Sequence, residues 1–172
     1  IPQRYGYATD GRVFFLTTPV AVPSRRCGVH QVEYYWNLLK PLGLSGGASL
    51  PTLVVTADES RQLDIRLAGA GVGVSDIVIG INPGSTYGSA KRWLPERFAE
   101  VAQRLAERIG QDESAQVVVV ILGARGEESL GKDIAARINR RSVVLSGATT
   151  IRELMAVVKR CRLLITNDTG PM

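Results

Sequence analysis

The sequence predicts an α/β fold built on a parallel sheet. From Asp76 onward, short apolar runs alternate with longer amphipathic stretches. The runs are rich in β-branched residues and apolar at both odd and even positions, which is typical of strands buried on both faces. The stretches between them have the period of helices. Strands that alternate with helices are joined by right-handed crossovers, so we expect parallel strands with helices on the faces of the sheet.

The first 75 residues contain fewer clear elements. A helix is expected over residues 30–42, because apolar residues recur there at helical spacing and Gly43 suits its end. The stripe expected to be buried consists of Val32, Tyr35, Leu39 and Leu42. A short strand over residues 53–55 and a helix over about 58–68 follow. The glycine-rich segment 69–73 resembles a linker and is the predicted domain boundary.

Four strands are expected after this boundary, over residues 77–81, 117–122, 143–145 and 163–165. Three helices separate them. The first follows Pro95, which suits an opening helical turn, and its apolar face consists of Phe98, Val101, Ala102, Leu105 and Ile109. The second covers about residues 127–138. The third begins at Thr150, with Glu153 three residues on, a capping box in which each side chain accepts a hydrogen bond from the other residue's backbone N–H.

The composition excludes several classes of protein. A hydrophobic content of 45% is too high for a disordered chain, and no apolar run approaches the roughly 20 residues of a membrane helix. The two cysteines, Cys27 and Cys161, match no metal-ligand spacing, which favours a reducing cytoplasm. The start at Ile1 shows no signal-peptide pattern. Because the chain ends at Met172 directly after a Gly-Pro loop, we expect it to be cut at both ends.

The net charge is +5, and after residue 80 there are 14 basic and 10 acidic residues. Only 6% of the residues are aromatic, and no basic stripe is interleaved with them, so nucleic-acid binding is disfavoured. A solvated helical surface is the simplest explanation of the charge. A phosphate-bearing small ligand or an acidic membrane surface would use the same charge.

The segments that follow the four predicted strands are small, hydroxylated and glycine-bearing. They are residues 82–93, 123–126, 146–150 and 167–171. In a parallel sheet these segments meet at the carboxyl edge, where ligands bind and backbone N–H groups approach anions closely. Ordinary turn chemistry would explain one such loop. Four of them, with Lys91 in the longest, favour a phosphate-bearing ligand.

Two common nucleotide motifs are not matched. No strand is followed by G-x-G-x-x-G, which argues against a dehydrogenase. Residues 126–132 fit G-x-x-x-x-G-K, but Asp133 stands where a P-loop needs Ser or Thr, and the segment follows its strand too late. We therefore expect neither a dinucleotide site nor a P-loop.

Three motifs carry a resemblance to a known family. They are Asn82-Pro83-Gly84-Ser85-Thr86, Ala90-Lys91-Arg92-Trp93 and Asn167-Asp168-Thr169-Gly170-Pro171-Met172. They resemble the donor-domain motifs of the bacterial ADP-heptose:lipopolysaccharide heptosyltransferases, glycosyltransferase family 9, and the Lys-Arg-Trp version resembles the type II branch. The resemblance is specific over residues 79–172. It is weaker over residues 1–75, where segments 6–12 and 30–35 look like the later part of the acceptor domain.

The resemblance implies a GT-B fold, in which two Rossmann-like domains face each other, both incomplete here. Residues 1–75 would be the C-terminal part of the acceptor-side domain, and residues 76–172 the N-terminal part of the donor domain. The implied reaction is an inverting, metal-independent transfer of heptose from ADP-heptose to the inner core of lipopolysaccharide, with a lipid A-Kdo-heptose acceptor and no cofactor. The implied location is the cytoplasm, peripheral to the inner membrane.

The resemblance also assigns roles to single residues. Lys91 would neutralise the donor diphosphate, with Ser85 and Thr86 as hydrogen-bonding neighbours. The remaining contacts would come from Glu127 to the ribose, from the backbone at Thr149 along the adenine, and from Asp168, Thr169 and Gly170 to diphosphate and sugar. Simpler roles stay open: Lys91 as a solvated lysine, Asp168 as a helix cap and Glu127 as a first-turn acid. The single histidine, His30, is expected to begin a helix rather than to act in catalysis.

This sequence also departs from the family pattern. The family's opening strand and loop, with the aspartate thought to deprotonate the acceptor, are not in the chain, nor is the histidine that follows Gly-Pro-Met. The catalytic base is therefore unassigned, and we expect the 172-residue chain by itself not to transfer sugar. Two alternatives stay open: another GT-B glycosyltransferase with a different nucleotide sugar, and a non-catalytic nucleotide- or phosphate-binding α/β module.

Overall fold

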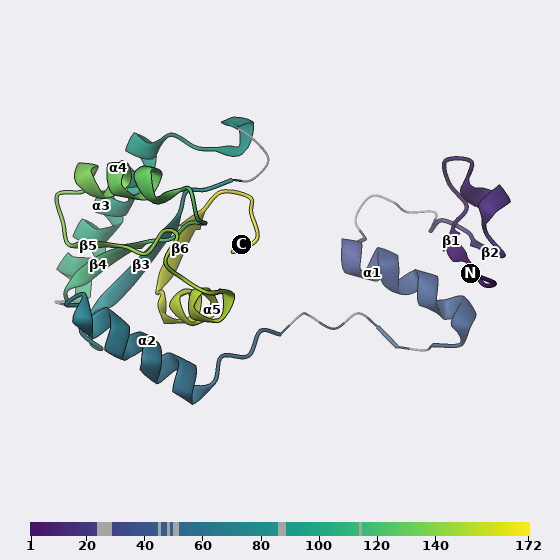
Figure 1. Ribbon diagram of the computed structural model, residues 1–172, viewed down its shortest axis with the longest axis horizontal. Helices are drawn as coiled ribbons and strands as arrows, with labels where there is room; N and C mark the ends of the chain where they lie inside the picture. The colour runs from purple at the N-terminus through teal and green to yellow at the C-terminus, as the bar shows by residue number, and fades with distance from the viewer. Residues whose placement is uncertain (24–28, 45, 48, 50–51, 86–88, 114) are drawn as a thin grey trace. The chain divides into compact units, whose positions relative to one another are not determined.

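The computed structural model describes residues 1–23, 29–44, 46–47, 49, 52–85, 89–113 and 115–172. The chain forms two compact units, residues 1–52 and 53–172 (Figure 1). The first unit contains β1 (Tyr5–Tyr7), β2 (Thr18–Val20) and α1 (Gln31–Trp36). The second contains all the remaining strands and the longer helices.

The first unit is small and only partly apolar inside. β1 pairs with β2 in parallel, and a short 3-10 helix, Arg12–Phe15, connects them. Tyr7 at the end of β1 is buried, its ring stacks on Tyr34 with centroids 4.3 Å apart, and its hydroxyl donates to the Tyr34 carbonyl. This burial raises the pKa of Tyr7.

The helix expected over residues 30–42 is present, but its stripe is not buried. His30 begins it as predicted, because its Nδ1 accepts from the Val32 N–H at 3.3 Å. After α1 the chain continues as a 3-10 helix, Asn37–Leu42, and ends at Gly43 with φ +75°. Val32 and Tyr35 lie on α1, before the 3-10 helix begins, so their exposure depends on which surfaces pack against α1 rather than on the period of the helix. Of the four stripe residues Leu39 is half-buried, while Val32, Tyr35 and Leu42 are 40%, 58% and 46% exposed.

The second unit contains the predicted parallel sheet. Its strands are β3 (Ile77–Asn82), β4 (Val117–Ile121), β5 (Ser142–Val144) and β6 (Leu163–Thr166). The order across the sheet is β5-β4-β3-β6, and all three pairs are parallel. The central strands β3 and β4 are buried almost throughout, whereas the edge strands β5 and β6 are mostly half-buried. Burial on both faces was therefore predicted correctly only for the two central strands, because the helices cover the edges incompletely.

Helices cover both faces of this sheet (Figure 1). α2 (Ala57–Gly69) and α5 (Ile151–Arg160) cover one face, and α3 (Pro95–Glu113) and α4 (Glu128–Arg137) cover the other. Alternate residues of β4 serve the two cores: Val118 and Val120 pack with α2 and α5, and Val119 and Ile121 with α3 and α4. Among the described helices, none is both long and apolar enough to cross a membrane.

The boundary between the units differs from the predicted one. It follows Thr52, so α2 belongs to the second unit, and the segment 69–73 is a tight turn inside that unit. In this turn the Val72 N–H donates to the Leu67 carbonyl at 2.8 Å, and Val72 is buried in the core beneath α2. The glycines that resembled a linker instead allow the chain to reverse between α2 and β3, with Gly71 at φ +79°.

The strand predicted over residues 53–55 is also absent, since these described residues pair with no other strand. Leu53 and Val54 are 75% and 66% exposed. The Val54 carbonyl accepts from Arg152 at 3.0 Å, and the Val55 carbonyl accepts from Lys159 at 3.2 Å. Side chains of α5 therefore satisfy the backbone that a neighbouring strand would otherwise bond.

Cys161, which follows α5, is a half-buried free thiol. Burial raises the pKa of this thiol to about 11, so it is protonated and unreactive near neutral pH. The other cysteine, Cys27, lies outside the described residues.

Candidate functional site

A pocket of about 260 Å³ opens at the carboxyl edge of the four-stranded sheet. Residues that follow each of the four strands line it, as the sequence predicted. They are Asn82 at the end of β3 with Gly84 and Ser85 after it, Gly123, Ala124 and Glu127 after β4, Thr149, Thr150, Ile151 and Leu154 after β5, and Thr169, Gly170 and Pro171 after β6.

The structure brings most of the predicted site residues together. Five of them line the pocket: Ser85, Glu127, Thr149, Thr169 and Gly170. Lys91 and Asp168 lie on the segments beside it and contact each other instead. Thr86 falls outside the described residues.

Lys91 and Asp168 form an ion pair that joins the loops after β3 and β6. Lys91 Nζ lies 2.8 Å from Asp168 Oδ2, and the hydrogen bond lowers the pKa of Asp168. The side chains are 48% and 70% exposed, so water screens the pair and its strength is modest. Lys91 is thus solvent-exposed and paired at the same time, because its ammonium bonds to the Asp168 carboxylate. The role of Asp168 as a helix cap stays a prediction.

Two buried asparagines, which were not assigned a role from the sequence, tie these loops together. Asn82 Nδ2 donates to Thr169 Oγ1 at 2.9 Å. Asn167 Nδ2 donates to the Pro83 carbonyl at 2.7 Å, and its Oδ1 accepts from the Trp93 N–H at 3.3 Å. Both amides are less than 10% exposed. An amide directly after a buried strand was the available signal, because such a group must find a partner in the adjoining loops.

Glu127 turns its carboxylate towards the loops rather than along its own helix. Oε2 accepts from the Ala124 N–H at 2.8 Å, and no side-chain cap to α4 forms. The carboxylate lies against Gly84, where an added Cβ would clash with both carboxylate oxygens. Gly84 is therefore a site residue because it leaves room for Glu127. The reading of Glu127 as a first-turn helix acid does not describe these contacts.

Ser85 presents a buried hydroxyl at the wall of the pocket. The residue is 3% exposed, and its Oγ has no hydrogen-bond partner among the residues that the structure describes. Its carbonyl accepts from the Arg92 guanidinium at 3.0 Å, which holds the backbone in place. A buried hydroxyl without a protein partner fits a polar atom of a ligand.

The opposite wall is formed by the start of α5. Thr150 and Glu153 make the predicted capping box, with Thr150 N–H to Glu153 Oε2 at 2.8 Å and Glu153 N–H to Thr150 Oγ1 at 3.2 Å. Ile151 and Leu154 add apolar surface beside this helix N-terminus. The wall thus combines an apolar face with the positive end of a helix dipole. In the described part of the chain, no group of three or more His, Cys, Asp or Glu is placed to hold a metal ion.

Comparison with known proteins now decides the family. The model of glycosyltransferase family 9 (heptosyltransferase) matches residues 1–172. The chain belongs to glycosyltransferase family 9. The predicted resemblance is confirmed, and with it the α/β fold class of the GT-B kind with parallel sheets.

Individual relatives of this family 9 chain are similar over part or all of its length. Lipopolysaccharide heptosyltransferase 2 of Escherichia coli K12 is 32% identical over 183 residues, covering 100% of this chain and 49% of its own. Lipooligosaccharide heptosyltransferase 2 of Campylobacter jejuni (serotype O:6) is 32% identical over 98 residues, covering 55% of this chain and 29% of its own.

Two solved structures are similar in fold. The glycosyl transferase family 9 protein of Veillonella parvula matches with a TM-score of 0.75 and 28% identity, over 99% of this chain and 47% of that one. E. coli ADP-heptose lps heptosyltransferase II matches with a TM-score of 0.73 and 24% identity, which supports the fold alone. The family 9 chain thus spans about half the length of the relatives that it matches across its whole length.

Proposed function

We propose that this family 9 chain supplies the donor site of a heptosyltransferase, which transfers heptose from ADP-heptose to the inner core of lipopolysaccharide. The observation that carries the proposal is the pocket at the carboxyl edge of the second unit's sheet. It places a carboxylate, a buried hydroxyl with no partner among the described residues and an apolar helix start around one cavity, with Lys91 beside it. Those groups complement a nucleoside diphosphate.

Each part of ADP has a complementary wall. The Glu127 carboxylate accepts hydrogen bonds from the ribose hydroxyls, and Ile151, Leu154 and the backbone at Thr149 receive the adenine. Thr169 and Gly170 offer a hydroxyl and backbone to the diphosphate. The volume of about 260 Å³ suits the nucleoside part of the donor, since pockets for whole small ligands begin at roughly 300 Å³.

Departure of ADP from the sugar increases the negative charge on the diphosphate. In this proposal the Lys91 ammonium shifts part of its bonding from Asp168 to the diphosphate and stabilises that charge. This arrangement supplies positive charge without a metal. The transfer inverts the anomeric centre in a single displacement, and the general base lies outside the residues assigned here.

The acceptor is the lipid A-Kdo-heptose inner core, so the enzyme works in the cytoplasm at the surface of the inner membrane. The net charge of +5 favours approach to anionic head groups. The charge is general support for this location and defines no particular surface.

The proposal is tested first by Lys91→Ala in the 172-residue chain. We expect ADP to bind about tenfold more weakly, because one charge-assisted hydrogen bond to phosphate is lost, while adenosine binds equally well. Isothermal titration calorimetry measures both. Lys132→Ala is the matched control, since Lys132 is exposed on α4 and does not line the pocket. It should leave ADP affinity unchanged, and a loss there would favour a P-loop.

Equal ADP affinity in wild type and Lys91→Ala would contradict the role of Lys91. The reaction itself is tested with the full-length enzyme, ADP-heptose and a heptose-bearing acceptor, in the presence of EDTA. Proton NMR of the product's anomeric centre should show inversion. Tighter binding of UDP or GDP than ADP would indicate another nucleotide sugar, and ADP binding without transfer would indicate a non-catalytic module.

A further inference from the structure

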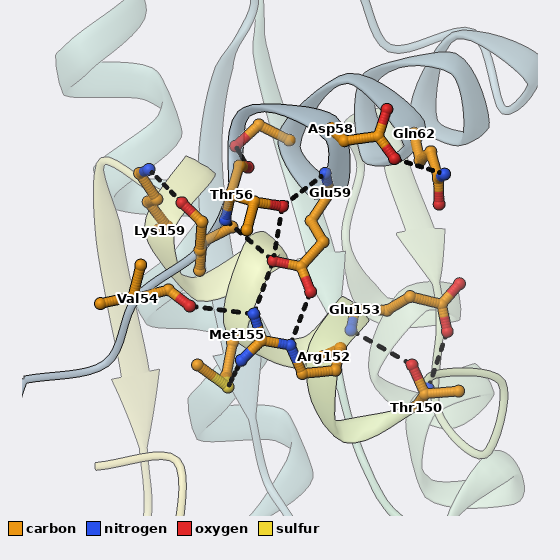
Figure 2. A network of polar contacts seen from close by, with 12 residues as sticks. Val54, Thr56, Asp58, Glu59, Gln62, Thr150, Arg152, Glu153, Met155 and Lys159 are labelled. Atoms are coloured by element: carbon orange, nitrogen blue, oxygen red, sulfur yellow. Dashed lines mark hydrogen bonds and ion pairs between the residues drawn. The ribbon is translucent and has the colours of Figure 1, made fainter.

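α2 and α5 are joined by charged side chains on the face of the sheet that they share. Figure 2 shows one of these joints, where the Glu59 carboxylate lies between Thr56 on its own helix and Arg152 on α5. Arg152 binds this carboxylate with two N–H groups, each at 2.6 Å, and donates to the Val54 carbonyl at 3.0 Å. None of Val54, Glu59 and Arg152 lines the pocket.

Arg66, in the last turn of α2, makes a second joint of a different kind. One guanidinium nitrogen, Nη1, lies 2.5 Å from Glu153 Oε1. The other, Nη2, donates to the Ala148 carbonyl at 2.6 Å. The side chain is 33% exposed and therefore partly desolvated, which strengthens both bonds relative to those of a freely solvated arginine.

The two acceptors of Arg66 lie on either side of Thr149 and Thr150: Ala148 in the turn before α5 and Glu153 in the first turn of α5. Ala148 immediately precedes Thr149 and Thr150, which line the pocket. Glu153 caps Thr150 with its other carboxylate oxygen, and hydrogen bonds from Thr150 together with Arg66 lower the pKa of Glu153. The preceding residue of the turn, Gly147, donates its N–H to the Gly123 carbonyl at 2.9 Å.

The turn is thus held from two directions, by β4's loop on one side and by α2 on the other. We propose that Arg66 is a positioning residue that holds the turn 147–150 in the form that receives the nucleotide base. The inference rests on the proposed donor site and extends it, because it names a residue outside the pocket that sets selectivity for the base of a nucleoside diphosphate.

The geometry requires a guanidinium. Its planar fork directs two N–H groups at two separate acceptors, one a carboxylate and one a backbone carbonyl. The two bonds together fix the orientation of the guanidinium plane. A lysine ammonium at the same place bonds either acceptor as a point charge but does not reproduce the fork. Arg66→Lys therefore keeps the charge and removes the geometry.

Binding titrations of the 172-residue chain with ADP, UDP and pyrophosphate test the inference. In Arg66→Gln, ADP should bind roughly tenfold more weakly, because binding must then also order the turn 147–150. The affinity for pyrophosphate, which has no base, should be unchanged. The affinity for UDP should fall less than that for ADP, so that the preference for ADP over UDP falls. The ADP affinity of Arg66→Lys should lie between those of Arg66→Gln and the wild type. Glu153→Gln retains a capping box with Thr150 and leaves the Arg66 bond to Ala148. It should therefore lose less ADP affinity than Arg66→Gln.

Arg152→Gln is the matched control. It removes an arginine that joins the same two helices but does not bond to the turn, so it should lower thermal stability without changing the ratio of ADP to UDP affinity. Equal ADP affinity in wild type and Arg66→Gln would overturn the inference, as would an equal fall in affinity for ADP and pyrophosphate. Failure of the wild type to bind ADP would instead overturn the proposed donor site.

Discussion

The Glu127 carboxylate occupies space that is free only because Gly84 has no side chain. Glu127 reaches back from the start of α4 to the Ala124 N–H, and its carboxylate fills the space in which a Cβ of residue 84 would lie. Gly84 and Glu127 both line the pocket. The position of the carboxylate therefore depends on a residue with no side chain of its own.

Gly84→Ala should weaken ADP binding about as much as Glu127→Ala, because the added Cβ displaces the carboxylate from its bond to Ala124. The two changes should not add: in the Glu127→Ala background, Gly84→Ala should cost little further affinity. Calorimetry on the four proteins of this cycle measures the coupling. Gly69→Ala is a control, since an added Cβ there meets no described atom within 4 Å and Gly69 does not line the pocket. Fully additive losses would show that Gly84 acts independently of Glu127.

Helices α2 and α5 both begin with a capping box. Thr56 with Glu59 and Thr150 with Glu153 form two capping boxes, and each glutamate also pairs with an arginine of the other helix. Capping and docking are thereby linked, because one carboxylate serves both. The hydrogen bond from Arg152, followed by that from the Thr56 N–H, lowers the pKa of Glu59 to about 2, compared with an ordinary value of 4.5.

Glu59→Gln should lower the melting temperature at pH 7, since glutamine retains the capping box but not the ion pair with Arg152. The pKa of Glu59 is depressed in the folded state, so its stabilisation is complete above pH 4.5 and is lost as pH falls towards 2. The difference between wild type and variant should therefore shrink below pH 4.5. Thermal unfolding followed by circular dichroism from pH 7 to pH 3 checks this.

Asp58→Asn is the matched control for this helix. It removes a neighbouring first-turn carboxylate whose bonds to Arg61 and Gln62 stay within α2. Its effect should be smaller than that of Glu59→Gln at pH 7. An equal effect would mean that the bond to α5 adds nothing beyond the interaction with the helix dipole.

In the molecule as a whole, α2 joins the unit that follows it rather than the one that precedes it. Leu63 and Leu67 of α2 are 4% and 2% exposed and pack in one core with Val118, Val120 and residues of α5. The boundary accordingly lies after Thr52, although the glycines at 69–73 suggested a later one.

Leu67→Ala should destabilise the second unit by about 2–5 kcal/mol, the usual cost of a cavity left by a buried leucine. The two tryptophans report the units separately, because Trp36 belongs to the first and Trp93 to the second. With Trp36→Phe, fluorescence during urea unfolding follows Trp93 and should show the loss. With Trp93→Phe, the Trp36 transition should not move. A shift of the Trp36 transition alone would contradict this assignment, because it would show that α2 unfolds with the first unit.

Local patterns were sufficient for most of the second unit. The four strands, the start of α3 at Pro95 and the capping box at Thr150 follow from neighbouring residues, since hydrophobic period and end signals act over one or two turns. Five of the eight candidate site residues line the pocket because parallel strands end at one edge of a sheet.

Contacts between distant residues decided the rest. The exposure of Val32 and Tyr35, the place of α2 and the absence of a strand at 53–55 depend on which surfaces meet, and no local period specifies that. The Lys91–Asp168 pair spans 77 positions, and the Arg66–Glu153 pair spans 87. The sequence thus supplied the family and the loops of the site, and tertiary packing determined how those loops are held.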